Sequence, residues 1–169
     1  ELQMRKVFGI VGWKNSRKTT FMEKLVQDIC LKRYSVSTIK HAHHSFDIDK
    51  DGKDSFRHRQ AGAREVLVSS ENRWALMSEV VNNRQPSLKQ LISKMSPVDL
   101  ILVEGFKLCD HKKLEINRYE NSQPFLYETD TSICALVTDA EIQTLSLPCF
   151  GLNDIDDVAN FILRNVGLV

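Results

Sequence analysis

The stretch from Lys6 to Thr20 constrains the fold of this chain more than any other part of its sequence. It begins with an uncharged run of Val, Phe, Ile and Gly between Val7 and Gly12, which predicts a strand buried on both faces of a parallel sheet. The following residues fit the phosphate-binding loop pattern G-x-x-x-x-G-K-[ST] at every fixed position but one, because Arg17 stands where the second glycine belongs. The stretch therefore predicts a buried strand that leads into a phosphate-binding loop with one departure from the pattern.

The sequence after the loop supports this interpretation. Apolar residues recur there at the spacing of a helix with one buried face, namely Phe21, Met22, Leu25, Val26, Ile29 and Cys30. We expect this helix to begin at the loop, so that its first N–H groups, which have no partners within the helix, point at a bound anion. Residues 34–40 are rich in β-branched side chains and predict a second parallel strand, joined by a right-handed crossover.

Two further predicted strands end in acidic residues. Four apolar residues lead to Glu104, which matches the Walker B pattern, whose acid orients Mg²⁺ or a metal-bound water beside the phosphates. Such runs are common, but this one follows the phosphate loop in the order that the fold requires. A buried strand from Ile133 to Val137 is followed by Asp139, which can accept the N1 and N2 protons of guanine, although an acid in this place more often caps a helix.

The other segments predict smaller elements around this core. They are a short helix over 54–60 capped by Asp54 or Ser55, a hairpin of strands 65–69 and 73–78, a helix that starts at Pro86-Ser87 and ends at Pro97, strands over 114–118 and 148–152, and a final helix capped by Asn153 or Asp154. The alternation over 114–118 predicts one solvent-facing side, and the polar residues 117–132 predict an irregular loop. A length of 169 residues, 42% of them hydrophobic, predicts a single domain over 1–169.

Composition limits the functional classes. The 23 Lys and Arg residues balance 22 Asp and Glu residues, which argues against binding to nucleic acid or to an anionic membrane. No segment approaches the roughly 18 apolar residues of a membrane span, and the N-terminus lacks the apolar core of a signal peptide. The four cysteines form no C-x-x-C pair and are interpreted as reduced, packed thiols. We therefore expect a cytoplasmic protein.

The polar segment 41–54 has two features of metal sites. Asp47, Asp49, Asp51 and Gly52 match the first half of a calcium-binding loop, but His58 stands where the bidentate Glu of that loop is needed. His41, His43 and His44 are candidate zinc ligands without the i, i+4 spacing or nearby cysteine of common zinc sites. The histidines suit contacts with an anion or substrate as well, and their role is left open.

The motifs together resemble the molybdopterin-guanine dinucleotide biosynthesis adapter family, often called MobB. The resemblance rests on the loop from Gly12 to Thr20, on I-K-H-A-H-H from Ile39, G-K-D-S from Gly52, A-G-A from Ala61, R-W-A-L-M from Arg73 and D-L-I-L-V-E-G-F-K from Asp99. It spans nearly the whole chain and is weakest over 117–132. It implies a P-loop NTPase three-layer α/β sandwich with a mostly parallel sheet and appended antiparallel strands, and a homodimer formed through an extended sheet.

In function, the resemblance implies a protein that binds GTP with Mg²⁺, hydrolyses it slowly, and assists the guanylyltransferase that attaches GMP to molybdopterin. It implies that Lys14 to Arg17 donate backbone N–H groups to the phosphates, that Lys18 bridges the β- and γ-oxygens, and that Thr20 approaches the α-phosphate. It also implies Thr19 as a ligand of Mg²⁺ and Glu104 as the residue that orients the metal's water. The candidate nucleotide-binding residues are thus Gly12, Lys14, Asn15, Ser16, Arg17, Lys18, Thr19, Thr20 and Asp139.

Arg17 leaves more than one function open. If its position requires a positive φ, the side chain costs roughly 1–2 kcal/mol, whereas its charge can bind phosphate directly. We expect the loop to keep its shape but to hold GTP more weakly than a variant with the consensus glycine. The alternatives are a P-loop small-molecule kinase, for which Arg57, Arg59 and Asp54 are the candidate lid and acceptor residues, and a degenerate scaffold that acts only through protein contacts.

Overall fold

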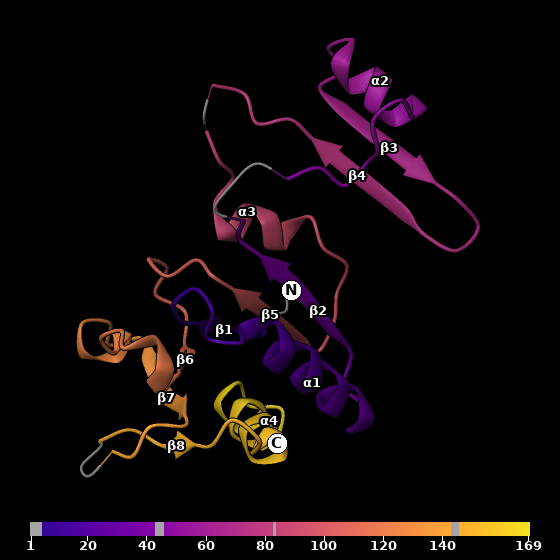
Figure 1. Ribbon diagram of the computed structural model, residues 1–169. Helices are drawn as coiled ribbons and strands as arrows, with labels where there is room; N and C mark the ends of the chain where they lie inside the picture. Colours follow the sequence, from indigo (N-terminus) through magenta and orange to yellow (C-terminus); the bar gives the residue numbers. More distant parts are fainter. Residues whose placement is uncertain (1–4, 43–45, 83, 143–145) are drawn as a thin grey trace. The chain divides into compact units, whose positions relative to one another are not determined.

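A computed structural model describes residues 5–42, 46–82, 84–142 and 146–169, and its chain divides into two compact units. One unit comprises residues 1–41 and 96–169, and the other comprises residues 42–95. Figure 1 labels the elements of both. None of the helices in the described ranges is long and apolar enough to cross a membrane. That the chain folds as a single domain stays a prediction.

The larger unit is built on six strands in the order β2-β5-β1-β6-β7-β8, all of them parallel. The strands are β1 (Val7–Val11), β2 (Val36–Lys40), β5 (Leu100–Glu104), β6 (Lys113–Asn117), β7 (Ile133–Thr138) and β8 (Cys149–Phe150). The predicted phosphate-loop strand β1 lies in the centre of this sheet, between β5 and β6. The predicted parallel sheet is therefore confirmed, with the two informative strands next to each other.

Two helices, α1 (Lys18–Leu31) and α4 (Ile155–Asn165), contact each other and pack on this sheet. Alternate strand residues such as Phe8 and Ile10 of β1 join a core with Leu25 and Ile29 of α1 and with Ile162 of α4, all fully buried. The helical spacing after the loop predicted the buried face of α1. The carboxylate of Asp154 at the start of α4 accepts a hydrogen bond from the backbone N–H of Gly151 (2.7 Å), so the predicted cap bond to the helix is not made.

Strand β6 departs from the prediction of one solvent-facing side. All five of its residues are buried, including Lys113, Glu115 and Asn117, whose side chains alternate with the core residues Leu114 and Ile116. The alternation of polar and apolar residues was therefore interpreted with the right period but the wrong environment. The polar side is covered by chain segments whose backbone groups it binds. Within 117–132, the chain forms the short 3-10 helices η1 (Tyr119–Asn121) and η2 (Leu126–Glu128).

The smaller unit contains α2 (Asp54–Gln60), α3 (Leu88–Ser93) and the antiparallel pair β3 (Glu65–Ser69) and β4 (Trp74–Ser78). The hairpin is confirmed. A capping box of Ser87 and Gln90 begins α3, as the sequence predicts. The predicted cap of α2 is wrong, because Lys53 occupies the N-cap position and makes no side-chain bond, which leaves Asp54 in the first turn to act through its charge.

The cysteines also differ from the prediction. All four are free thiols, but Cys30 and Cys149 are exposed and only Cys109 and Cys134 are half-buried. Burial raises the pKa of the Cys134 thiol. Apolar neighbours in sequence did not imply burial, because each exposed thiol lies at the outer side of its element.

Candidate nucleotide-binding site

Parallel pairing brings the motif residues together at one edge of the sheet, where all six strands end. On β5, Glu104 is in register with Ile10 of β1 on one side and with Lys40 of β2 on the other. On the far side of β1, Val11 is in register with Glu115 of β6. The predicted Walker B acid therefore lies beside the strand that enters the phosphate loop.

Close approach of the backbone explains the first glycine of the loop. A Cβ on Gly12 would collide with the carbonyl oxygen of Ile116 and would lie 2.9 Å from Oγ of Ser16. The Ser16 side chain is itself buried, and its backbone N–H donates to the carbonyl of Trp13 (3.3 Å). The loop is thus a tight turn packed onto the end of β6, which is the shape that a phosphate cradle needs.

Positive φ angles occur at two non-glycine residues of the loop, Asn15 (65°) and Arg17 (59°). With ψ 25°, Arg17 has the left-handed conformation that the consensus glycine adopts without strain. It occupies the N-cap position of α1, and its side chain makes no capping bond and is exposed. The expectation that the loop keeps its shape despite Arg17 is consistent with this geometry, and the strained residue is the one that departs from the pattern.

The Lys18 ammonium group lies inside the turn. It donates to the carbonyl of Trp13 (2.6 Å) and to Oγ of Ser16 (3.2 Å). Burial lowers the pKa of Lys18; the carboxylate of Glu104 opposes this shift, and the positive charges of Lys107 and Lys40 add to it. The lysine and the acid predicted from the two motifs therefore act on each other, and two further lysines lie within electrostatic range.

The remaining predicted ligands are placed as follows. The side chain of Glu104 is 14% exposed, and its Oε1 lies 3.8 Å from Nζ of Lys40. Thr19 and Thr20 lie in the exposed first turn of α1, next to Lys18. The loop, Lys18 and the acid are thus assembled at one edge, and the threonines follow directly from the loop.

Asp139 is engaged by the segment that follows β6. Its Oδ1 accepts from the backbone N–H of Tyr119 (2.8 Å) and its Oδ2 from Nε of Arg118 (3.3 Å). The Tyr119 N–H, and then Arg118, hold the pKa of this carboxyl below its ordinary value. Residues 140–142, which follow Asp139 directly, are not helical, so the alternative role as a helix cap is not realised there.

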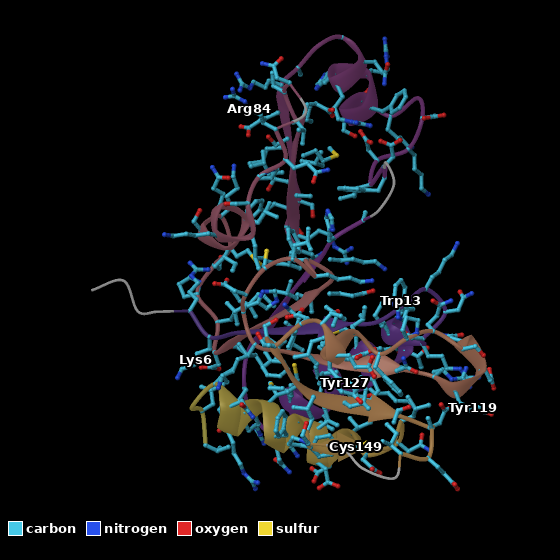
Figure 2. All side chains as sticks on the ribbon, turned by 90° about the vertical axis from the view of Figure 1, so that its left-hand side faces the viewer. Lys6, Trp13, Arg84, Tyr119, Tyr127 and Cys149 are labelled. Atoms are coloured by element: carbon cyan, nitrogen blue, oxygen red, sulfur yellow. The ribbon has the colours of Figure 1, made fainter. Side chains whose placement is uncertain are left out.

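The segment 118–130 lies over the phosphate loop, a contact that the sequence did not predict. The indole Nε1–H of Trp13 donates to the carbonyl of Pro124 (2.8 Å), and the amide of Asn121 donates to the carbonyl of Lys14 (3.4 Å). These residues border a cavity of about 380 Å³, which is lined by Trp13, Lys14, Asn15, Asn121 and Gln123. Figure 2 shows Trp13 and Tyr119 at the same end of the unit, with Lys6 at the other end.

Buried polar residues of β6 hold this segment in place. The Glu115 carboxylate accepts from the backbone N–H groups of Leu126 (2.9 Å) and Tyr127 (3.0 Å) and from the amide of Asn117 (3.4 Å). A charged residue within a central strand was the available signal, because a buried carboxylate requires partners of this kind.

The two metal-like features resolve differently. The backbone N–H of His41 donates to the carbonyl of Glu104 (2.9 Å), and its ring stacks on Phe106 with centroids 4.7 Å apart. His43 and His44 lie outside the described residues. The side chains described contain no cluster of His, Cys, Asp and Glu residues that could hold a metal ion.

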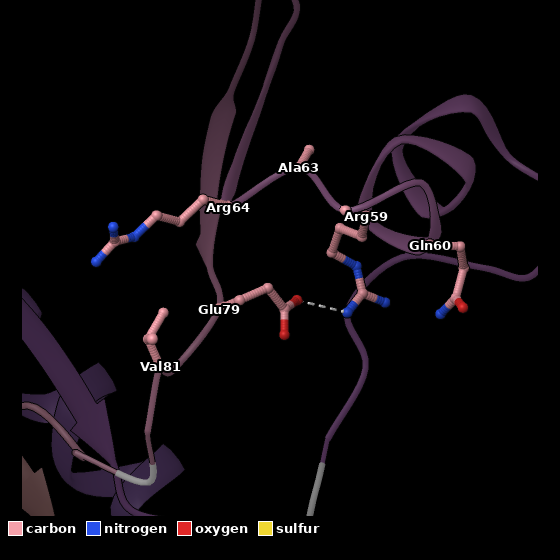
Figure 3. A pocket seen from close by; sticks show the side chains of 7 residues that line it. Arg59, Gln60, Ala63, Arg64, Glu79 and Val81 are labelled. Atoms are coloured by element: carbon pink, nitrogen blue, oxygen red, sulfur yellow. Dashed lines mark hydrogen bonds and ion pairs between the residues drawn. The ribbon is translucent and has the colours of Figure 1, made fainter.

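Arg59 supplies the positive charge beside the acidic segment, where a calcium-binding loop would hold a metal ion. Its guanidinium binds Asp47 (2.9 Å), Asp49 (2.8 Å) and Glu79 (2.9 Å), and these hydrogen bonds raise its pKa above the ordinary value, with Asp49 the largest cause. Figure 3 shows the bond to Glu79 within a cavity of about 370 Å³ in the smaller unit. The D-x-D-x-D-G pattern therefore serves an ion-pair network of this unit.

Comparison with known proteins agrees with this geometry. The family model "MobB: Molybdopterin guanine dinucleotide synthesis protein B" matches residues 7–139. The chain belongs to the MobB family. It is 35% identical over 164 residues to the molybdopterin-guanine dinucleotide biosynthesis adapter protein of Escherichia coli K12, covering 95% of this chain and 93% of the relative. It is 36% identical over 158 residues to the protein of the same name from Haemophilus influenzae, covering 92% and 86%.

Solved structures of this family share the fold. The MobB homolog from Bacillus stearothermophilus aligns with a TM-score of 0.72 at 26% identity, covering 96% of this chain and 99% of that one. Bacillus subtilis MobB aligns with a TM-score of 0.75 at 24% identity, covering 94% and 96%. The P-loop NTPase-like α/β fold, with its mostly parallel sheet and appended antiparallel pair, is therefore confirmed.

Proposed function

We propose that this protein is a GTP-binding adapter that assists the guanylyltransferase converting molybdopterin to molybdopterin guanine dinucleotide. The names of the two relatives described above support the pathway. The observation that supports nucleotide binding is the assembly of the loop, Lys18 and Glu104 at the edge where β1 and β5 end side by side. The protein acts in the cytoplasm and contacts molybdopterin only through its partner.

The residues present fit a nucleotide with Mg²⁺. The turn that follows Gly12 would offer backbone N–H groups from Lys14 to Arg17 to an anion, with the Ser16 N–H leaving the Trp13 carbonyl, and Lys18 supplies a cation beside them. Thr19 and Glu104 would hold the metal, since hydroxyl and carboxylate oxygens are the donors that Mg²⁺ prefers. The metal would supply positive charge beside the phosphates. The strained Arg17 is a reason to expect slow hydrolysis or none.

Selection of guanine falls to Asp139 in this proposal. Its carboxylate would exchange the Tyr119 N–H and Arg118 for the N1 and N2 protons of the base, while Arg118 keeps its ion pair with Glu120 (3.0 Å). Asp139→Asn replaces one acceptor with a donor, so the variant should lose affinity for GTP and gain affinity for xanthosine triphosphate. An Asp139→Asn protein that binds GTP as the wild type does would contradict this role.

The hairpin is the surface that we assign to a second copy of the chain. On one side of it, Leu67 (60% exposed) is in register with Leu76 (42% exposed), next to Trp74 (62% exposed). Two strands alone are marginally stable, and a matching pair from a second copy would cover this face, in line with the homodimer that the family resemblance implies. Trp74 is then an interface residue.

Sedimentation tests the homodimer. Leu76→Lys places a charge in the apolar face and should convert a dimer to a monomer. Leu31→Lys is the matched control, because Leu31 is also exposed (73%) but ends α1 in the larger unit. A wild-type protein that sediments as a monomer at micromolar concentration would contradict the homodimer.

A binding assay with the purified guanylyltransferase tests the adapter function. We expect association with the wild type to strengthen when GTP and Mg²⁺ are added, and we expect Lys18→Ala to remove that response. Association that does not depend on nucleotide would favour the degenerate scaffold. Phosphorylated product from ATP in an acceptor screen would favour the kinase, a function against which Arg59 argues because three carboxylates already bind it.

A further inference from the structure

Lys107 lies beside the phosphate loop, although it belongs to no nucleotide motif. It follows the Walker B strand three residues after Glu104. Its ammonium nitrogen lies 4.7 Å from the ring centroid of Trp13, the second residue of the loop. The carbonyl of the same Trp13 accepts a hydrogen bond from Lys18. One loop residue is therefore contacted by two lysines, one at its backbone and one at its ring.

The backbone around Lys107 is held from inside the sheet. After β5 the chain turns through positive φ at Gly105 (91°) and Phe106 (51°). The fully buried ammonium of Lys113 donates to the carbonyls of Lys107 (3.3 Å) and Cys109. A buried lysine that binds this turn keeps the Lys107 side chain close to the loop.

The charges around the loop are not balanced. Burial is the main cause of the lowered pKa of Lys18, and the positive charges of Lys107 and Lys40 lower it further. Glu104 is the acid that opposes them, and in the described part of the chain no carboxylate forms an ion pair with Lys107. Three cations near one carboxylate leave an excess of positive charge that a polyphosphate would neutralise.

We propose that Lys107 is a second phosphate-binding lysine, whose ammonium group leaves the face of Trp13 and donates to a terminal phosphate oxygen of the bound nucleotide. This inference rests on the proposed GTP binding. A partly exposed cation–π contact is weak, and a charge-assisted hydrogen bond to phosphate is stronger, so the exchange is favourable. Because Lys107 follows Glu104, it would act on the terminal phosphates and not on the α-phosphate.

Trp13 provides the readout. The chain has two tryptophans, so Trp74→Phe leaves Trp13 as the single tryptophan, which can be excited apart from the tyrosines. We expect GTP with Mg²⁺ to change the emission of Trp13 as Lys107 leaves its ring, and we expect Lys107→Met in the same background to abolish most of that change. An equal change in both proteins would overturn the proposal.

Affinities separate this inference from the proposed function. Lys107→Met should weaken GTP binding by about 10- to 100-fold, the range for a hydrogen bond to a charged group, and should leave GMP binding nearly unchanged. Lys112→Met is the matched control, since Lys112 is exposed and its nearest described partner is Asn165 of α4 (3.5 Å). If Lys18→Ala loses GTP while Lys107→Met binds it normally, the Lys107 role alone is overturned. If the wild type binds no GTP, both proposals are overturned.

Discussion

Replacing Arg17 tests whether the departure from the phosphate-loop pattern is a source of strain. Arg17 adopts φ 59° and ψ 25°, and its exposed side chain makes no capping bond to α1. The strain therefore comes from its Cβ, not from lost contacts. Arg17→Ala keeps this Cβ and removes the charge, whereas Arg17→Gly removes both, so the pair of variants separates conformation from charge.

The expected effect on stability follows from the backbone angles. A left-handed conformation costs a residue with a side chain roughly 1–2 kcal/mol. Glycine offsets roughly 0.5–1 kcal/mol of that gain, because it gives the unfolded chain more conformational entropy. Arg17→Gly should therefore be more stable than Arg17→Ala by about 0.5–1 kcal/mol, which is about 1–4 °C in Tm for a chain of this length. Arg17→Ala should match the wild type.

Thermal unfolding and GTP titration of the three proteins provide the assay. The glycine variant should also bind GTP more tightly than the wild type, because a backbone without Cβ lets the phosphates approach more closely. Equal Tm values for Arg17→Gly and Arg17→Ala would refute the strain argument. GTP affinity that is unchanged or lower in Arg17→Gly would refute the argument about the loop.

Two further predictions concern buried polar groups behind the site. Burial, and then the charge of Lys113, lower the pKa of His111, and neither of its ring nitrogens has a hydrogen-bond partner in the described part of the chain. A depressed histidine pKa favours the neutral form in the folded state, so the free energy of unfolding should fall as pH drops below about 6.5. Urea unfolding of His111→Gln should show a smaller decrease in this free energy over the same pH range. Lys113→Met should cost about 3–5 kcal/mol in the same assay, because it leaves partly exposed Asp130 and two carbonyls without their cation, while Lys112→Met should stay within about 0.5 kcal/mol.

The central part of the fold could be predicted because its residues have a single environment. The uncharged runs of β1 and β5 are buried on both sides, and such runs are typical of central parallel strands. The helical stripe that includes Leu25 and Ile29 faces one core. The order of loop, helix and acid then fixed which strand ends meet, and register placed Glu104 beside β1.

The covering segments could not be predicted, because their contacts are made by polar residues with distant backbone groups. Nothing near Glu115 in the sequence shows that it binds the N–H groups of Leu126 and Tyr127. For the same reason a lysine such as Lys113 would be expected to face solvent from its sequence alone, although it is fully buried. Polar alternation in a strand indicates two different faces, but it does not distinguish water from buried partners.

The left-handed angle of Arg17 shows what a motif can predict when one residue departs from it. The pattern requires glycine where the backbone has a positive φ, and the chain adopts that angle with arginine. The conformation was thus predictable from its neighbours, while the effect on ligand affinity was not. Affinity depends on how the charge of Arg17 and its Cβ act on a phosphate, and these effects oppose each other.

Titration calorimetry with GTP and Mg²⁺ is the decisive test of nucleotide binding by this protein. We expect saturable binding to the wild type, weaker binding of ATP, and loss of the signal in Lys18→Ala, because the Lys18 ammonium lies inside the loop. Absence of binding for both nucleotides by the folded wild type would contradict it.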